Sequence, residues 1–150
     1  MRFGESAPAG LLGIGVDLVE IERFRRLGSS SPFFSRVFGP EELDYCMNCR
    51  DPYPHFAAMF AAKEAVVKAL SHTVQVPVWR VRIDHGSNGE PEAHVARLDD
   101  VTIHVSMTHS SIHGAAIAVA TRGPAAMQGH RMVDTMIDEL RTALAREVIQ

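Results

Sequence analysis

Two short segments of the sequence carry acidic and basic side chains at spacings that suit phosphate chemistry. The first, GVD at residues 15–17, presents the carboxylate of Asp17 where an apolar run ends. The second, FAAKEAVVKA at residues 60–69, places Glu64 and Lys68 four residues apart. On a helix these two side chains share one face, while Lys63 points roughly 100° around the axis.

Carboxylate and ammonium groups together suit a metal-bound diphosphate. Magnesium keeps few protein ligands and takes the rest from phosphate and water. Phosphoryl transfer depends mainly on positioning and on charge stabilisation, which ammonium groups supply. Each feature also has a purely structural interpretation, since Asp17 is suited to cap a following helix and Glu64 with Lys68 to form an exposed pair worth ~0.3–0.5 kcal/mol. Their joint presence favours the magnesium–diphosphate interpretation.

The elements that must position these residues predict one α+β domain. Residues 11–16 are typical of a buried strand that ends at Asp17. The segment from His55 to Leu70 is the strongest predicted helix, and the prolines at 51–54 predict a loop before it. Further predicted elements are helices at 18–27, within 31–50 and at 125–150, β structure at 74–83, and an antiparallel hairpin of 101–106 and 115–121 with a broad polar connection. We divide the chain into a leader (1–10), the domain (11–123) and an appended amphipathic C-terminal helix (124–150).

Composition excludes several classes of protein. The net charge of −3 argues against the basic surface of a nucleic-acid binder, and no apolar stretch approaches the roughly 20 residues of a membrane helix. The N-terminus lacks the order of a secretory signal, so we expect a cytoplasmic protein without nucleic-acid or membrane partners. Cys46 and Cys49 have no second pair of ligands nearby and are interpreted as reduced thiols.

The order of these motifs resembles a known family. G-[IV]-D, followed by F-x-x-K-E-x-x-x-K-A, is similar to the signature of phosphopantetheinyl transferases, and this chain has GVD and then FAAKEAVVKA. GIGVDLVEIERFRRL at 13–27, RVFGPEELDYC at 36–46 and VSMTHSSIHGAAIAVA at 105–120 resemble the small holo-acyl-carrier-protein synthase branch. The resemblance covers residues 11–121.

The resemblance implies a fold and an activity. The fold is that of the 4'-phosphopantetheinyl transferases, an antiparallel sheet packed with helices in a single domain. The activity is magnesium-dependent transfer of 4'-phosphopantetheine from coenzyme A to a serine of an acyl carrier protein, with release of 3',5'-ADP. The assembly is a homotrimer with active sites between subunits. The alternative is a non-catalytic paralogue that binds a carrier protein or a partner subunit.

The resemblance also assigns roles to residues. Asp17 and Glu64 bind magnesium, Lys68 stabilises the diphosphate and protonates the leaving 3',5'-ADP phosphate, and Lys63 is a second phosphate contact. His109 contacts the coenzyme or the incoming serine. The serine proton goes to a metal-bound water or to Glu64, and the sequence does not choose between them.

A basic helical face follows Asp17. The resemblance implies that Arg23, Leu27, Phe33 and Arg36 dock an acidic helix of the carrier protein. Arginines steer an acidic partner, while apolar contacts fix its register. The structural alternative is a solvated basic face.

Three positions depart from the family pattern, all on the side expected to hold the coenzyme. Met59 replaces a common arginine, the loop 71–75 has no glycine, and Glu90 stands where a lysine is usual. These changes remove positive charge or phosphate-facing backbone. We therefore expect weakened or altered affinity for coenzyme A.

Overall fold

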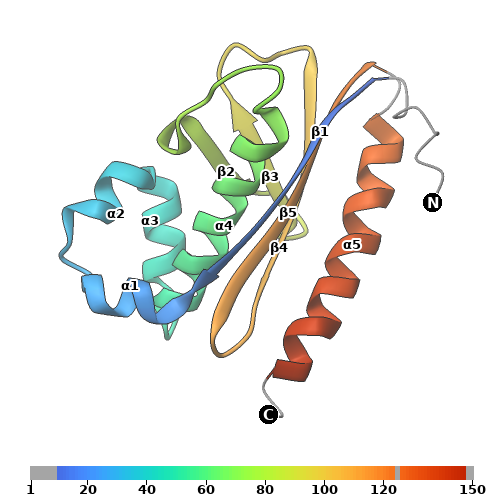
Figure 1. Ribbon diagram of the computed structural model, residues 1–150. Helices are drawn as coiled ribbons and strands as arrows, with labels where there is room; N and C mark the ends of the chain where they lie inside the picture. Colours follow the sequence, from blue (N-terminus) through green and yellow to red (C-terminus); the bar gives the residue numbers. More distant parts are fainter. Residues whose placement is uncertain (1–9, 124–125, 148–150) are drawn as a thin grey trace.

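The computed structural model describes residues 10–123 and 126–147 of the chain, and its architecture is α+β (Figure 1). The elements in chain order are β1 (Leu11–Glu20), α1 (Ile21–Leu27), α2 (Pro32–Val37), α3 (Pro40–Met47), α4 (Pro52–Leu70), the 3₁₀ turn η1 (Val78–Arg80), β2 (Val81–His85), β3 (Pro91–Val95), β4 (Val101–His109), β5 (His113–Arg122) and α5 (Ala126–Glu147). Within the described part of the chain, no helix is long and apolar enough to cross a membrane.

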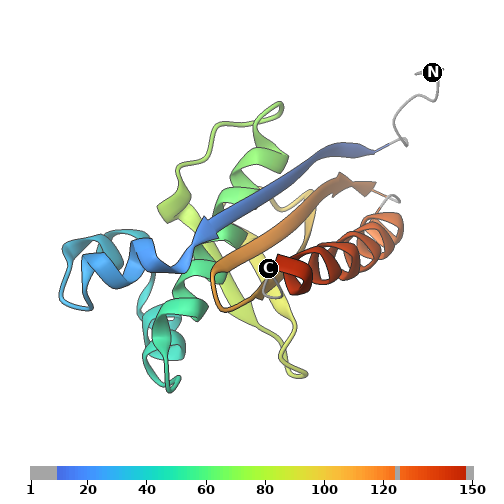
Figure 2. The ribbon, with the colours of Figure 1, turned by 60° about the horizontal axis from the view of Figure 1, so that its bottom comes forward.

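The strands form two antiparallel sheets. The larger sheet has the order β1-β5-β4, and β2 pairs with β3 in a separate two-stranded sheet. Figures 1 and 2 show α4 on one face of the larger sheet and α5 along the other face. The antiparallel sheet packed with helices and the C-terminal helix confirm the predicted fold class.

Several predicted boundaries were wrong, each for a local reason. β1 continues through Asp17 to Glu20, because it stays paired with β5, so the first helix begins at Ile21 and not at Leu18. The predicted loop before His55 is instead the first turn of α4. There Asp51 caps the helix by accepting a hydrogen bond from the Tyr53 N–H, and proline is tolerated in a first turn. The hairpin connection is only three residues, 110–112.

Helix α4 approaches the sheet closely enough for backbone to meet backbone. A Cβ atom at Gly13 would lie 2.2 Å from the Ala69 carbonyl oxygen, and one at Gly15 would lie 1.8 Å from the Ala65 carbonyl oxygen. On β5, a Cβ at Gly114 would lie 2.4 Å from the backbone nitrogen of Ala58. Glycine on the strands and alanine on the helix therefore let α4 lie directly against β1 and β5.

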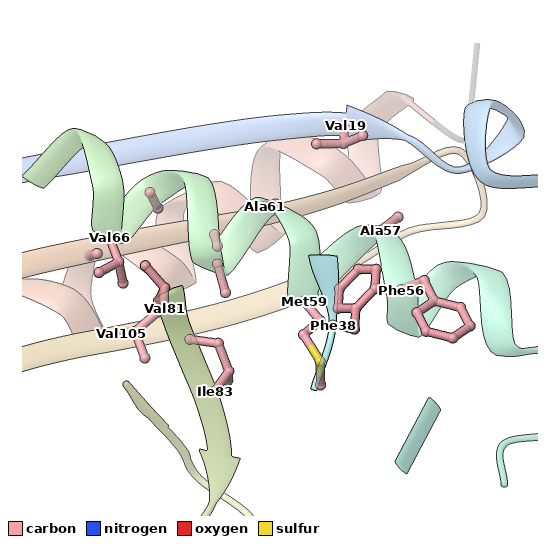
Figure 3. Packing of buried hydrophobic residues seen from close by; sticks show 14 of the residues in the cluster. Val19, Phe38, Phe56, Ala57, Met59, Ala61, Val66, Val81, Ile83 and Val105 are labelled. Atoms are coloured by element: carbon pink, nitrogen blue, oxygen red, sulfur yellow. The ribbon is translucent and has the colours of Figure 1, made fainter. Parts of the chain in front are cut away.

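The other side of α4 buries larger side chains. Figure 3 shows Met59 and Val66 of α4 on the side of Val81 and Ile83 of β2, and Phe56 beside Phe38. Rings from α1, α2, the residue that follows α2, and α4 extend this core in a cluster of edge-to-face and tilted contacts, formed by Phe24, Phe33, Phe34, Phe38, Phe56 and Phe60. The helix is thus fixed on two sides.

We expect Gly15→Ala to destabilise the protein, because the added methyl group collides with the backbone of α4. Overpacking of this kind costs about 1–3 kcal/mol or more. The matched control is Gly39→Ala, where the nearest atom to a new Cβ is 3.7 Å away. Denaturant unfolding of both variants measures the difference. Equal stability of the two variants would show that the strand and helix separate at little cost.

Candidate active site

Asp17, Glu64 and Lys68 meet at the β1 edge of the sheet, and we call this group the acidic edge. Gly13, Gly15 and Asp17 alternate along β1 and so share the strand face that α4 covers. The Lys68 ammonium lies 2.7 Å from Asp17 Oδ1 and donates a hydrogen bond to the Val16 carbonyl at 2.9 Å. The close approach of α4 to β1 thus brings together residues that are far apart in the sequence.

The pKa of Glu64 depends on its burial and on the charges of its neighbours. Burial raises the pKa of Glu64, and the negative charge of Asp17 raises it further, while Lys68 and Arg23 act in the opposite direction. A carboxylate whose ionisation is opposed by burial and by a neighbouring negative charge marks a place where a cation is favourable. Hard oxygen donors fit magnesium best. Since the described residues offer no group of three or more acidic, histidine or cysteine side chains placed to hold a metal, the remaining ligands would come from substrate and water.

Lys63 lies away from the acidic edge. Its side chain is 1% exposed, and its ammonium is 2.6 Å from Glu42 Oε2. It also donates hydrogen bonds to the Val37 carbonyl at 2.9 Å and the Val81 carbonyl at 2.7 Å. All three donors of the ammonium are therefore used inside the protein. The structure does not bring Lys63 to the site, and we assign it to the framework instead of to the phosphate contact implied by the resemblance.

Glu42, the partner of Lys63, is a buried residue that the sequence did not single out. Its carboxylate accepts hydrogen bonds from the Gly39 N–H at the start of α3 and from the Ile83 N–H in β2, each at 2.7 Å. Burial lowers the pKa of Lys63, and the contact with Glu42 opposes that shift. The only signal in the sequence was the glutamate three residues after Gly39, which is typical of a helix start.

His109 is separated from the acidic edge by the width of the sheet. The strand order β1-β5-β4 puts Asp17 on one edge strand and His109 at the end of the other. The His109 ring packs edge-on to His55 of α4, with 5.1 Å between the centroids. One chain therefore does not unite the predicted catalytic residues.

A groove of about 1050 Å³ runs beside β4 and contains His109. We call it the His109 groove. Its walls come from α3, the start of α4, the turn between β2 and β3, β4 and α5. Burial lowers the pKa of both His55 and His85, which favours neutral imidazoles there. Its lining includes Tyr45, His55, His85, Glu90, Ser106, Met107, Thr108, His109, His130, Asp134, Ile137, Asp138 and Arg141.

The residues predicted to dock a carrier protein lie on α1 and α2. Arg23, Leu27 and Arg36 are exposed. Phe33 is half-buried in the ring cluster and contacts Phe24 and Phe60. The arginines are therefore accessible to a partner, while the phenylalanine also holds the two helices together.

The three departures from the family pattern fall in different environments. Met59 is fully buried in the core, so it cannot face a phosphate. The loop 71–75 follows the end of α4 and is largely exposed. Glu90 lines the His109 groove, where it adds negative charge.

Known proteins match this chain over most of its length. The profile of the 4'-phosphopantetheinyl transferase superfamily matches residues 13–120. A holo-[acyl-carrier-protein] synthase of Thermodesulfovibrio yellowstonii is 32% identical over 111 residues, which are 73% of this chain and 97% of that protein.

Solved structures extend the likeness. The acyl carrier protein synthase of Mycobacterium tuberculosis is 32% identical, with a TM-score of 0.61 over 76% of this chain and 100% of that chain. A synthase of Bacillus anthracis in complex with CoA (3',5'-ADP) is 24% identical, with a TM-score of 0.67 over 77% of this chain and 100% of that chain, and shows the fold alone. Helix α5 lies outside the residues that the superfamily profile matches.

We expect the buried Lys63–Glu42 pair to be strongly coupled. Glu42→Gln leaves a buried ammonium without its counter-ion, which costs about 3–5 kcal/mol. Glu41→Gln is the control, because Glu41 is the exposed neighbour on the same helix turn. Denaturant unfolding compares the two. In the double variant Glu42→Gln/Lys63→Met the loss should be smaller than the sum of the single losses, and additive losses would contradict the pairing.

Proposed function

The chain belongs to the 4'-phosphopantetheinyl transferase superfamily and is an enzyme of its holo-[acyl-carrier-protein] synthase type, and from this premise we propose a magnesium-dependent reaction at the acidic edge that releases 3',5'-ADP. The transferred group is phosphopantetheine, coenzyme A is its donor, and a carrier-protein serine is its acceptor. The observation that carries the proposal is the meeting of Asp17, Glu64 and Lys68. The cytoplasm remains the proposed compartment.

Asp17 and Glu64 are the residues that would hold the metal. Their carboxylates supply hard oxygen donors, and the repulsion between them is relieved by a divalent cation. When bound, magnesium neutralises charge on the coenzyme diphosphate and helps to orient it.

Lys68 is the residue proposed to receive the leaving group. Its ammonium makes two contacts within the chain, to Val16 and Asp17, and so retains a third donor for a phosphate oxygen. The serine oxygen forms a bond to the β-phosphorus as the bond to the bridging oxygen breaks, and 3',5'-ADP leaves with the electron pair. Lys68 stabilises that charge and donates a proton to it, while the serine proton goes to Glu64 or to water.

A complete site requires a second copy of the chain, and we propose the trimer that the resemblance implies. Asp17 and His109 lie on opposite edge strands, so the acidic edge of one copy would face the His109 groove of another. The outer face of β1 is apolar and exposed at Ile14 (41%), Val16 (45%) and Leu18 (50%). Burial of this strip against a second copy would remove apolar area from water.

The exposed arginines beside the acidic edge suit an acidic carrier protein. Burial and Asp17 raise the pKa of Glu64, and Arg23 is close enough to oppose that rise, so a carrier helix docked on α1 would lie beside the reacting groups. Leu27 and Arg36 would extend the same surface, and Phe33 would support it from below. The docking role of all four residues is part of this proposal.

We expect Asp17→Asn and Glu64→Gln each to lower kcat/KM by about 100-fold or more, because each removes a negatively charged oxygen donor proposed to hold the magnesium that orients the diphosphate. The assay combines the protein, magnesium, coenzyme A and apo-carrier proteins, and reads the mass added to the carrier. Asp99→Asn, an exposed carboxylate between β3 and β4, is the control. Chelation should abolish transfer and magnesium restore it. Full activity in both site variants would refute the assignment, and folded wild-type protein that modifies no carrier would support the non-catalytic alternative.

Mixing two inactive variants tests the shared site. Asp17→Asn lacks a working acidic edge, whereas His109→Ala lacks a working groove. In randomly mixed trimers about a quarter of the sites combine two intact halves, so co-refolded variants should regain activity that neither has alone. Light scattering checks the mass of the assembly. A monomeric mass, or no recovery on mixing, would place the complete site within one chain.

A further inference from the structure

The His109 groove has an unusual balance of charge for a site that meets coenzyme A. Its described lining includes three carboxylates, Glu90, Asp134 and Asp138. Among the same lining residues, Arg141 is the one side chain that is a cation at every physiological pH. Coenzyme A carries a diphosphate and a phosphate monoester, so a polyanion entering this groove meets a single permanent positive charge.

Arg141 is held at the groove by the packing of α5. Ile137, one helical turn earlier, is buried and also lines the groove, so Arg141 follows it on nearly the same side of the helix. Val133 and Leu144 are buried as well, and Val133 packs against Ile117 and Val119 of β5. The backbone that carries Arg141 is therefore anchored to the sheet.

Within the described residues, the ion pair of the Arg141 guanidinium is with an exposed carboxylate. Its ion pair joins Nη1 to Asp138 Oδ1 at 3.3 Å on the same helix, and both side chains are more than half exposed. An exposed pair of this kind contributes about 0–1 kcal/mol, so a phosphate that accepts two parallel hydrogen bonds competes with it easily.

We propose that Arg141 binds a phosphate group of coenzyme A in the His109 groove, which rests on the proposed function. Met59 is buried and Glu90 is acidic, so neither supplies a cation there. Helix α5, which lies outside the superfamily match, supplies a cation to the groove through Arg141. Arg141 is thus a specificity-determining residue contributed by an added element.

The test is calorimetric binding of coenzyme A to the full chain. We expect Arg141→Gln to weaken binding about tenfold or more, the equivalent of one charge-assisted hydrogen-bonded contact. Arg146→Gln is the matched control, because Arg146 is exposed in the last turn of the same helix and does not line the groove. The control should bind within about twofold of the wild type. Since Arg141 is exposed, thermal unfolding of both variants should match the wild type.

Dephospho-coenzyme A identifies the phosphate. If Arg141 binds the 3'-phosphate, the wild type loses affinity for this analogue and Arg141→Gln adds no further loss. If Arg141 binds the diphosphate, the variant weakens both ligands equally. Equal binding of coenzyme A by the Arg141 and Arg146 variants overturns the inference while the proposed function stands. Failure of the wild type to bind coenzyme A overturns the proposed function itself.

Discussion

The close approach of α4 to the sheet is the constraint on which the rest of the structure depends. Gly13 and Gly15 have no Cβ atoms, so the carbonyl oxygens of Ala65 and Ala69 lie where side chains would otherwise stand. Asp17 follows on the same strand face and is therefore carried to the flank of α4. A separation larger by one methyl group would move the carboxylate away from the helix that supplies the basic and second acidic groups.

The two adjacent charged residues of α4 serve opposite sides of the helix. Lys63 points inward to Glu42 and holds α3 and β2 against the helix, whereas Glu64 points to the β1 edge. A buried ion pair saturated with hydrogen bonds fixes a unique arrangement, because any shift leaves a desolvated charge unpaired. Of these two adjacent residues, Lys63 therefore stabilises the packing of α4 against α3 and β2, and Glu64 belongs to the acidic edge. Because α4 is held on both sides, a rotation of the helix about its axis is unfavourable.

The sequence predicted the meeting of Asp17, Glu64 and Lys68 better than it predicted the framework around them. Helical periodicity puts Glu64 and Lys68 on one face, whereas the residue types and the family resemblance led us to expect Asp17 beside them. The burial of Lys63 could not be predicted from the sequence, since a lysine is rarely found fully buried and its partner Glu42 lies in a distant segment. The extension of β1 beyond Asp17 was also missed, because strand length is set by pairing with β5, a long-range contact that local patterning does not contain.

The two edges of the larger sheet carry different sets of charged groups. The β1 edge combines carboxylates with Lys68, and the groove at the β4 edge combines histidines with three carboxylates and Arg141. In the part of the chain that the structure describes, Asp17, Glu64 and Lys68 lie at one edge of the sheet and the His109 groove lies at the other, so the proposed reaction would need these edges of two copies to face each other. Helix α5 adds to the second edge only, through residues on the side that borders the groove. If Arg141 binds the coenzyme as proposed, this addition would alter how the coenzyme is held and leave the acidic edge unchanged, so affinity for the coenzyme and the chemistry of transfer could vary separately in this chain.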